Sequence, residues 1–166
     1  KKPQVLPAKR NPSQIQEILE LIGPLKPKGE TLLASSLHEI AETVRMRAMI
    51  IVVSDMLDEP SDILDAVLHL RDRKHEVVLF HLFDPQELEF TFDRPTRFVD
   101  LEGAGSLITE PTVIRAEYLA RLDEHVKELR QGCLEAQARY HIVRTDNPLV
   151  DVIDDFSAGR IGGKAA

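Results

Sequence analysis

The sequence has few of the residues that mark secreted or nucleic-acid-binding proteins. It contains no tryptophan and one cysteine, Cys133, which cannot form a disulfide within the chain, so nothing points to an oxidising compartment. Lysine and arginine number 21 against 28 acidic residues, which gives a formal net charge of -7. A protein whose main partner is a nucleic-acid backbone needs a basic surface, so we expect no nucleic-acid partner.

Targeting signals are also missing from the sequence. No apolar run has the length of a membrane span and no signal peptide is recognisable, so we expect a cytoplasmic protein. The sequence begins Lys1-Lys2-Pro3 without an initiator methionine, and we expect that an upstream part of the natural chain is absent. We predict one partial domain over residues 1–166, with an ordered core at 11–160 and tails at 1–10 and 161–166.

What the sequence does contain is the alternation of helix and strand patterns that is typical of an α/β domain. Hydrophobic residues make up 43% of the chain, enough to form a core. Apolar residues at helical spacing predict helices over about 11–22, 31–45, 60–73 and 112–138, and a last helix from Pro148 that turns Leu149, Val152, Ile153 and Phe156 inward. Runs of apolar residues predict strands at 48–53, 77–83 and 140–143. Leu88, Phe90 and Phe92 alternate with polar residues, which predicts a small β-hairpin between 88 and 109.

The resulting fold class is a doubly wound, mainly parallel sheet flanked by helices. Three strands are few, because sheets commonly have about 4–6. The strand at 48–53 is apolar at every position, which predicts burial on both faces, yet it would lie at an uncovered edge. We therefore expect either that N-terminal strands are missing or that another chain, such as a second copy, covers this edge.

Polar side chains follow each predicted strand, where open parallel sheets bind their ligands. Asp55 and Asp58 follow the first strand, Asp84 the second and Asp146 the third, and Thr31 opens a helix that could begin at the same edge. Carboxylate and hydroxyl oxygens suit Mg²⁺ and other hard cations. The alternative, which the pattern alone favours, is that these residues are helix caps or loop residues.

Signals for other chemistry are weak. Gly29 is followed by Glu30 rather than by the lysine that a phosphate-binding loop requires. Ser54 lacks the flanking glycines of a nucleophile elbow. His81 lies within an apolar strand and is expected to be a core residue with a hydrogen-bond partner, and Cys133 on an apolar helix face is expected to behave as a small hydrophobe.

Several segments together resemble an uncharacterised bacterial family whose members carry a von Willebrand factor A-like domain and are often encoded beside MoxR-type AAA+ ATPases. The resemblance covers about residues 23–156 and is carried by Lys28-Gly29-Glu30-Thr31, Met49-Ile50-Ile51-Val52-Val53-Ser54-Asp55, His75-Glu76-Val77-Val78-Leu79-Phe80-His81, Asp84-Pro85-Gln86-Glu87-Leu88, Phe98-Val99-Asp100-Leu101-Glu102 and Tyr140-His141-Ile142-Val143-Arg144-Thr145-Asp146-Asn147-Pro148-Leu149.

The resemblance implies a metal-ion-dependent adhesion site. In such domains an Asp-x-Ser-x-Ser loop, a threonine and an aspartate hold a divalent cation. Thr31 matches the second element and Asp55 the third, but no Asp-x-Ser-x-Ser occurs in this sequence. We expect a partial site here, Mg²⁺ or another divalent cation bound only in the full-length protein, and contacts with a partner or ligand at Asp58, Asp84 and Asp146.

Three functions remain as hypotheses. The first is a non-enzymatic interaction or adaptor module, metal-ion-dependent at full length, that works with a MoxR-type AAA+ ATPase or its client proteins. The second is an enzyme that handles phosphoryl groups or phosphoesters on a flavodoxin-like or receiver-like sheet, with Asp55, Asp58 and Asp84 as its acidic centre. The third is a structural platform that assembles through the exposed sheet edge.

Overall fold

A parallel sheet of three strands lies at the centre of the fold in the computed structural model, which describes residues 6–7, 10–25, 32–99 and 105–158. The strands are β1 (Met49–Ser54), β2 (Glu76–Phe83) and β5 (Arg139–Arg144), in the order β1-β2-β5. Ser54 pairs with His81, and Phe83 pairs with Arg144, so β2 and β5 extend beyond the end of β1. The predicted α/β class and parallel sheet are confirmed.

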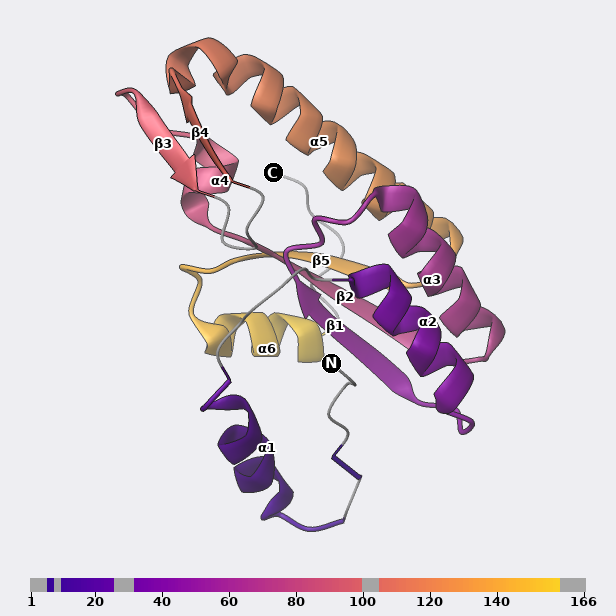
Figure 1. Cartoon of the computed structure of the whole chain (residues 1–166). Coiled ribbons are helices and arrows are strands. Elements are labelled where there is room, and N and C mark those ends of the chain that lie inside the picture. Colours follow the sequence, from indigo (N-terminus) through magenta and orange to yellow (C-terminus); the bar gives the residue numbers. More distant parts are fainter. Residues whose placement is uncertain (1–5, 8–9, 26–31, 100–104, 159–166) are drawn as a thin grey trace.

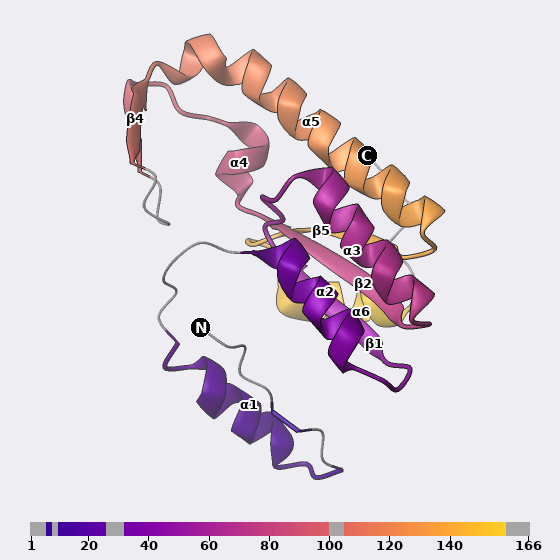
Figure 2. The same ribbon diagram turned by 45° about the vertical axis from the view of Figure 1, so that its right-hand side comes forward.

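Three helices cover one face of this sheet and a fourth covers part of the other face (Figures 1 and 2). The first three are α2 (Leu33–Thr43), α3 (Pro60–Asp72) and α5 (Pro111–Glu135). Their apolar stripes meet the inward side chains of the strands in one buried cluster, which includes Leu37, Ile63, Val67, Leu70, Leu79, Leu129 and Cys133. On the other face, Phe156 of α6 (Leu149–Ser157) packs edge-on against Phe80 of β2, with ring centroids 5.4 Å apart. The arrangement is consistent with part of a von Willebrand factor A-like fold.

A smaller unit extends from the carboxyl end of β2. The short helix α4 (Pro85–Glu89) is followed by an antiparallel hairpin of β3 (Thr96–Val99) and β4 (Ser106–Thr109). The hairpin confirms the predicted insertion, although it starts later than expected. Leu88 and Phe90 do not belong to a strand, because Asp84 and Glu87 form a capping box that starts a helix instead. The prediction that residues 88–92 form a strand is therefore wrong.

The strand β1 is buried on one face only, which corrects the prediction. Val52 is 7% exposed, whereas Met49, Ile51 and Val53 on the opposite face are 48%, 50% and 60% exposed. The helices α2 and α3 cover one face of β1. On the opposite face of the sheet, α6 packs over β2 and β5 and leaves β1 uncovered. In the described part of the chain β1 has one neighbouring strand, so it is an edge strand as expected.

Two amphipathic helices also keep apolar residues in solvent. The helix α1 (Gln14–Ile22) has no buried residue, and Ile15, Leu19 and Ile22 are more than half exposed. In α6, Val152 and Phe156 are partly buried as predicted, but Leu149 and Ile153 are 71% and 52% exposed, which corrects their predicted inward orientation. These helices each carry a wider apolar stripe than the described chain covers.

One arginine joins two connections at the amino end of the sheet. The guanidinium of Arg71, on α3, donates hydrogen bonds to the backbone carbonyls of Ala136 and His75 at 3.0 and 2.8 Å. Ala136 ends α5 ahead of β5, and His75 precedes β2. Lys74 and Gln137, which turn the chain at these two places, both have left-handed backbone conformations, with φ of 67° and 55°. Arg71 therefore ties together both helix-to-strand turns.

Candidate functional site

The loop that follows β1 presents Asp55 to solvent. Ser54 is the last residue of the strand, and its hydroxyl accepts a hydrogen bond from the backbone N–H of Met56 at 3.1 Å. The same hydroxyl lies 3.3 Å from Oδ1 of Asp55. Met56 has a left-handed backbone conformation with φ of 49°, and its side chain is fully buried. A bulky residue held in this sparsely populated region indicates a loop whose shape is fixed by its surroundings.

Two histidine side chains contact the backbone of this loop. His125 of α5 donates from Nε2 to the carbonyl of Met56 at 3.0 Å. His81 of β2, which is 1% exposed, interacts with the backbone of Asp55 and lies 2.6 Å through Nδ1 from the hydroxyl of Tyr140. A hydrogen bond therefore joins the His81 ring to the Tyr140 hydroxyl. The prediction that His81 is a core residue with a hydrogen-bond partner is confirmed.

Burial favours the neutral forms of the His81 and Tyr140 side chains. Desolvation lowers the pKa of His81 to about 4, although its contact with the Asp55 backbone acts in the opposite direction. Desolvation also raises the pKa of Tyr140 above its usual value. The backbone of Asp55 thus contacts a His81 side chain that is neutral at pH 7.

Asp58 has a structural role. Its Oδ2 accepts a hydrogen bond at 3.1 Å from the backbone N–H of Ala34, in the first turn of α2. The sequence could not show this because the two residues are 24 positions apart. Asp58 also lines a shallow cavity of about 330 Å³ together with Asp62, Asp65 and His38.

Asp84 caps a helix as well. Its Oδ1 accepts from the backbone N–H of Gln86 at 2.8 Å, and Oε2 of Glu87 accepts from the backbone N–H of Asp84 at 2.8 Å. This reciprocal pair starts α4 directly after β2. The sequence Asp84-Pro85-Gln86-Glu87 carries the signal for it, an acidic residue followed three positions later by glutamate.

Asp146 belongs to an ion-pair network. Arg144, at the end of β5, contacts Asp146 at 3.0 Å and Glu89 of α4 at 3.1 Å. The hydrogen bond and charge of Arg144 lower the pKa of Asp146. This network joins the carboxyl end of β5 to α4, so it positions the neighbouring elements.

The residues predicted to bind a metal are Thr31 and Asp55. Thr31 lies outside the described residues. Within residues 6–7, 10–25, 32–99 and 105–158, no group of three or more His, Cys, Asp or Glu side chains could hold a metal ion. Asp55 belongs to no such group among these residues.

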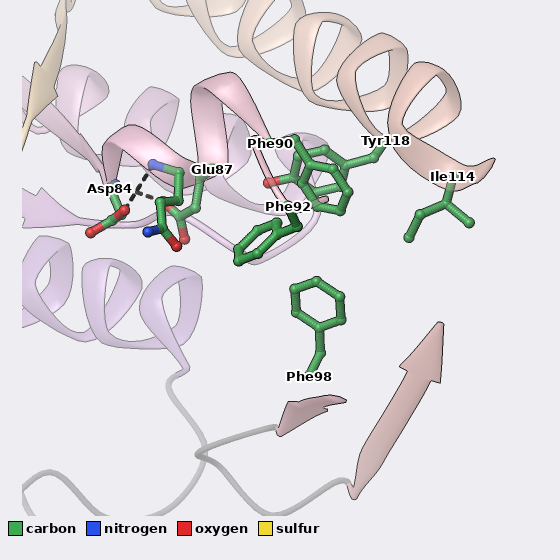
Figure 3. A pocket seen from close by; sticks show the side chains of 8 residues that line it. Asp84, Glu87, Phe90, Phe92, Phe98, Ile114 and Tyr118 are labelled. Atoms are coloured by element: carbon green, nitrogen blue, oxygen red, sulfur yellow. Dashed lines mark hydrogen bonds between the residues drawn. The ribbon is translucent and has the colours of Figure 1, made fainter. Parts of the chain in front are cut away.

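An aromatic pocket lies beside this edge and was missed in the sequence (Figure 3). It measures about 470 Å³ and is lined by Asp84, Gln86, Glu87, Phe90, Phe92, Phe98, Ile114 and Tyr118. The lining comes from α4, the segment after it, β3 and the first turns of α5. The aromatic residues were visible in the sequence, but Tyr118 is 20 positions or more from the three phenylalanines, so periodicity could not bring them together.

The fold is that of an α/β domain with an open parallel sheet, and its candidate site lies at the carboxyl edge of the strands. The chain belongs to the family described as "Protein of unknown function DUF58", whose family model matches residues 1–128. No curated protein and no solved structure matches the chain. No helix within the described ranges has the length and apolar character needed to cross a membrane.

Proposed function

We propose that this chain is part of a non-enzymatic protein-interaction module whose contact surface is the carboxyl edge of the sheet, centred on Asp55. One observation carries the proposal: Asp55 is an exposed carboxylate on a loop fixed by Ser54, His81 and His125. It forms no ion pair with a described residue. A loop held in one conformation that presents an exposed charge favours recognition, because little conformational freedom is lost on binding.

The other candidate carboxylates support binding over catalysis. Asp58 and Asp84 each cap a helix, and Asp146 is paired with Arg144. A phosphoryl-transfer centre built from Asp55, Asp58 and Asp84 would require two of these carboxylates to leave their caps. Incubation of the chain with acetyl phosphate and Mg²⁺, followed by mass spectrometry, tests this alternative: a phosphorylated Asp55 would contradict a purely non-enzymatic role.

Dependence on a divalent cation is proposed for the full-length protein only. Asp55 and Thr31 are the residues of this chain that resemble the third and second elements of a metal-ion-dependent adhesion site, and the first element, Asp-x-Ser-x-Ser, does not occur in this sequence. The resemblance to proteins encoded beside MoxR-type AAA+ ATPases supports such an ATPase, or its client proteins, as the partner.

The test compares Mn²⁺ binding by the full-length protein and by this chain. Mn²⁺ broadens nuclear magnetic resonance signals near its site, so we expect broadening around Asp55 at full length and its loss in Asp55→Ala. Asp72→Ala, which removes an exposed carboxylate from the last turn of α3, is the matched control and should bind Mn²⁺ normally. Unchanged broadening in Asp55→Ala would contradict the proposed site.

Partner binding is tested separately. A MoxR-type ATPase from the same genome should be retained by the full-length protein and lost with Asp55→Ala, with Asp72→Ala as the control. Retention that does not depend on Asp55 would remove this edge of the sheet as the contact surface.

A second candidate function, self-assembly, is favoured by the open face of β1. Met49, Ile51 and Val53 form an exposed apolar row on an edge strand. Such a strand can pair with the same strand of a second copy. Light scattering over a concentration series tests this candidate, because a monomer at all concentrations would contradict it, as would unchanged association in Ile51→Lys.

A further inference from the structure

The aromatic pocket beside α4 combines ring faces with negative charge. Phe90, Phe92, Phe98 and Tyr118 lie around it, with Ile114 at its side (Figure 3). Phe90 stacks on Tyr118 with centroids 4.4 Å apart, and Phe92 meets Phe98 edge to face at 5.3 Å. A volume of about 470 Å³ falls within the range of about 300–1,000 Å³ that small ligands and side chains occupy.

The backbone is strained to build this pocket. Phe90 ends α4 in a left-handed conformation, with φ of 45° and ψ of 51°, which is unfavourable for a bulky residue. Phe90 is nevertheless only 5% exposed, and its ring contacts three other rings, those of Phe92, Phe98 and Tyr118. Strain of this kind is kept where the surroundings require one orientation.

No described cation forms an ion pair with the two carboxylates at the pocket. Asp84 and Glu87 each accept one backbone hydrogen bond through one oxygen, and neither forms an ion pair with a described residue. Arg144 is paired with Glu89 and Asp146, and Arg115 donates to the backbone carbonyl of Glu89. The charge of Glu87 reaches into the pocket: after burial, it is the second cause that raises the pKa of Tyr118.

We propose that this pocket binds a basic side chain, arginine in the first instance, presented by a partner polypeptide. Aromatic faces attract cations through their quadrupole, and a guanidinium also stacks on them. Two carboxylates at the same opening supply the opposite charge and hydrogen-bond acceptors. A purely apolar ligand would leave both carboxylates beside a dry surface, which costs free energy. The inference deepens the proposed function, on which it rests, by naming the chemistry of the partner.

The test uses two short peptides, acetyl-Gly-Arg-Gly-amide and the same peptide with citrulline, which has nearly the shape of arginine but no charge. We expect the arginine peptide to shift the signals of the Ile114 methyl groups and the Phe92 and Phe98 rings saturably, at millimolar concentration. The citrulline peptide should bind about fivefold more weakly or worse. Equal binding of the two peptides would overturn the proposal in favour of a neutral ligand.

A matched pair of variants separates the charge from the fold. Glu87→Gln keeps the capping box, since glutamine serves at that position, but removes the charge at the pocket. It should weaken arginine-peptide binding about fivefold and leave citrulline-peptide binding unchanged. Glu39→Gln, which removes an equal charge from the exposed face of α2, should change neither. Unchanged arginine binding in Glu87→Gln would overturn the proposal.

The role of the rings is tested with Phe92→Leu, which keeps apolar bulk and removes one ring face. It should reduce the preference for arginine over citrulline, and an unchanged preference would count against stacking on this ring. Asp55→Ala should leave peptide binding intact. If Asp55→Ala removes partner binding at full length while the peptides show no charge preference, the pocket inference fails and the proposed function stands. If the peptides show the charge preference but Asp55→Ala leaves partner binding at full length intact, the Asp55 surface is refuted and the pocket inference stands.

Discussion

The hydroxyl of Tyr140 lies 2.6 Å from Nδ1 of His81, so a hydrogen bond joins the side chains of the two neighbouring strands β5 and β2 beneath the Asp55 loop. Both groups are held in their neutral forms by burial. This pair connects the centre of the sheet with the proposed contact surface, and it makes the stability of the domain depend on pH.

The first prediction concerns acid. Because the pKa of His81 falls from 6.5 to about 4 on folding, the unfolded chain binds more protons between these values, and stability must decrease as pH falls through this window. The loss should approach about 3 kcal/mol near pH 4. His141, whose pKa is also lowered by burial, acts in the same direction. Urea unfolding at pH 7 and pH 5 measures the effect.

His81→Gln is the variant that isolates this contribution. It keeps a polar group that can bond to Tyr140 but does not titrate, so its stability should depend less on pH between 7 and 5 than that of the natural chain. Equal slopes for the two proteins would show that His81 does not carry the effect.

The second prediction concerns Cys133. The thiol is fully buried, and burial raises its pKa to about 12. Since the thiolate is the reactive form, a thiol reagent at pH 8 should label the folded chain only as fast as it unfolds. In urea, labelling should be complete within the mixing time of the assay. Rapid labelling without denaturant would contradict the burial of Cys133.

The third prediction concerns Gly132 in α5. Replacing glycine by alanine inside a helix usually stabilises it by about 1 kcal/mol. Here a Cβ atom would lie 2.5 Å from Cδ2 and 2.9 Å from Cγ of Leu64 in α3, so either the Leu64 side chain or the helices would have to shift. We expect Gly132→Ala to lower the free energy of unfolding by about 1–3 kcal/mol. In a double-mutant cycle, Leu64→Ala should remove most of this cost, and strict additivity of the two changes would refute the contact.

The fourth prediction contrasts two aspartates at the carboxyl edge. Asp84→Ala removes a helix cap and should cost about 1 kcal/mol of stability. Asp55→Ala removes an exposed side chain with no ion pair to a described residue, and its effect should stay within about 0.5 kcal/mol. Thermal unfolding of both variants checks this. A larger loss in Asp55→Ala would mean that its role is structural.

The sequence was sufficient for the elements whose pattern is local. The helices α3 and α5 and all three sheet strands are found within a few residues of their predicted bounds, because their apolar periodicity reflects a face that the chain does cover. The prediction of burial was wrong for apolar residues that no described element covers. Ile51 and Leu149 are the examples, since apolarity alone cannot show what covers a residue.

The location of the candidate site could be predicted from the sequence, but the roles of its residues could not. Parallel strands end at one edge, so Asp55, Asp84 and Asp146 could be placed there. Their partners could not be foreseen, because Asp58 bonds to Ala34 and Arg144 to Glu89 across 24 and 55 positions. The aromatic pocket depends on similar long-range packing between Phe90 and Tyr118.

The two hydrogen bonds of Arg71, to the carbonyls of Ala136 and His75, couple two parts of the backbone. Both helix-to-strand turns at the amino end share one guanidinium, so they should protect their amides from hydrogen exchange as a single cooperative unit. At the opposite end, Arg144 joins α4 to the turn after β5, and His125 holds the loop after β1 separately. A change in the loop after β1 should therefore disturb the exchange of its neighbours less than a change at Arg71 disturbs both turns at the amino end.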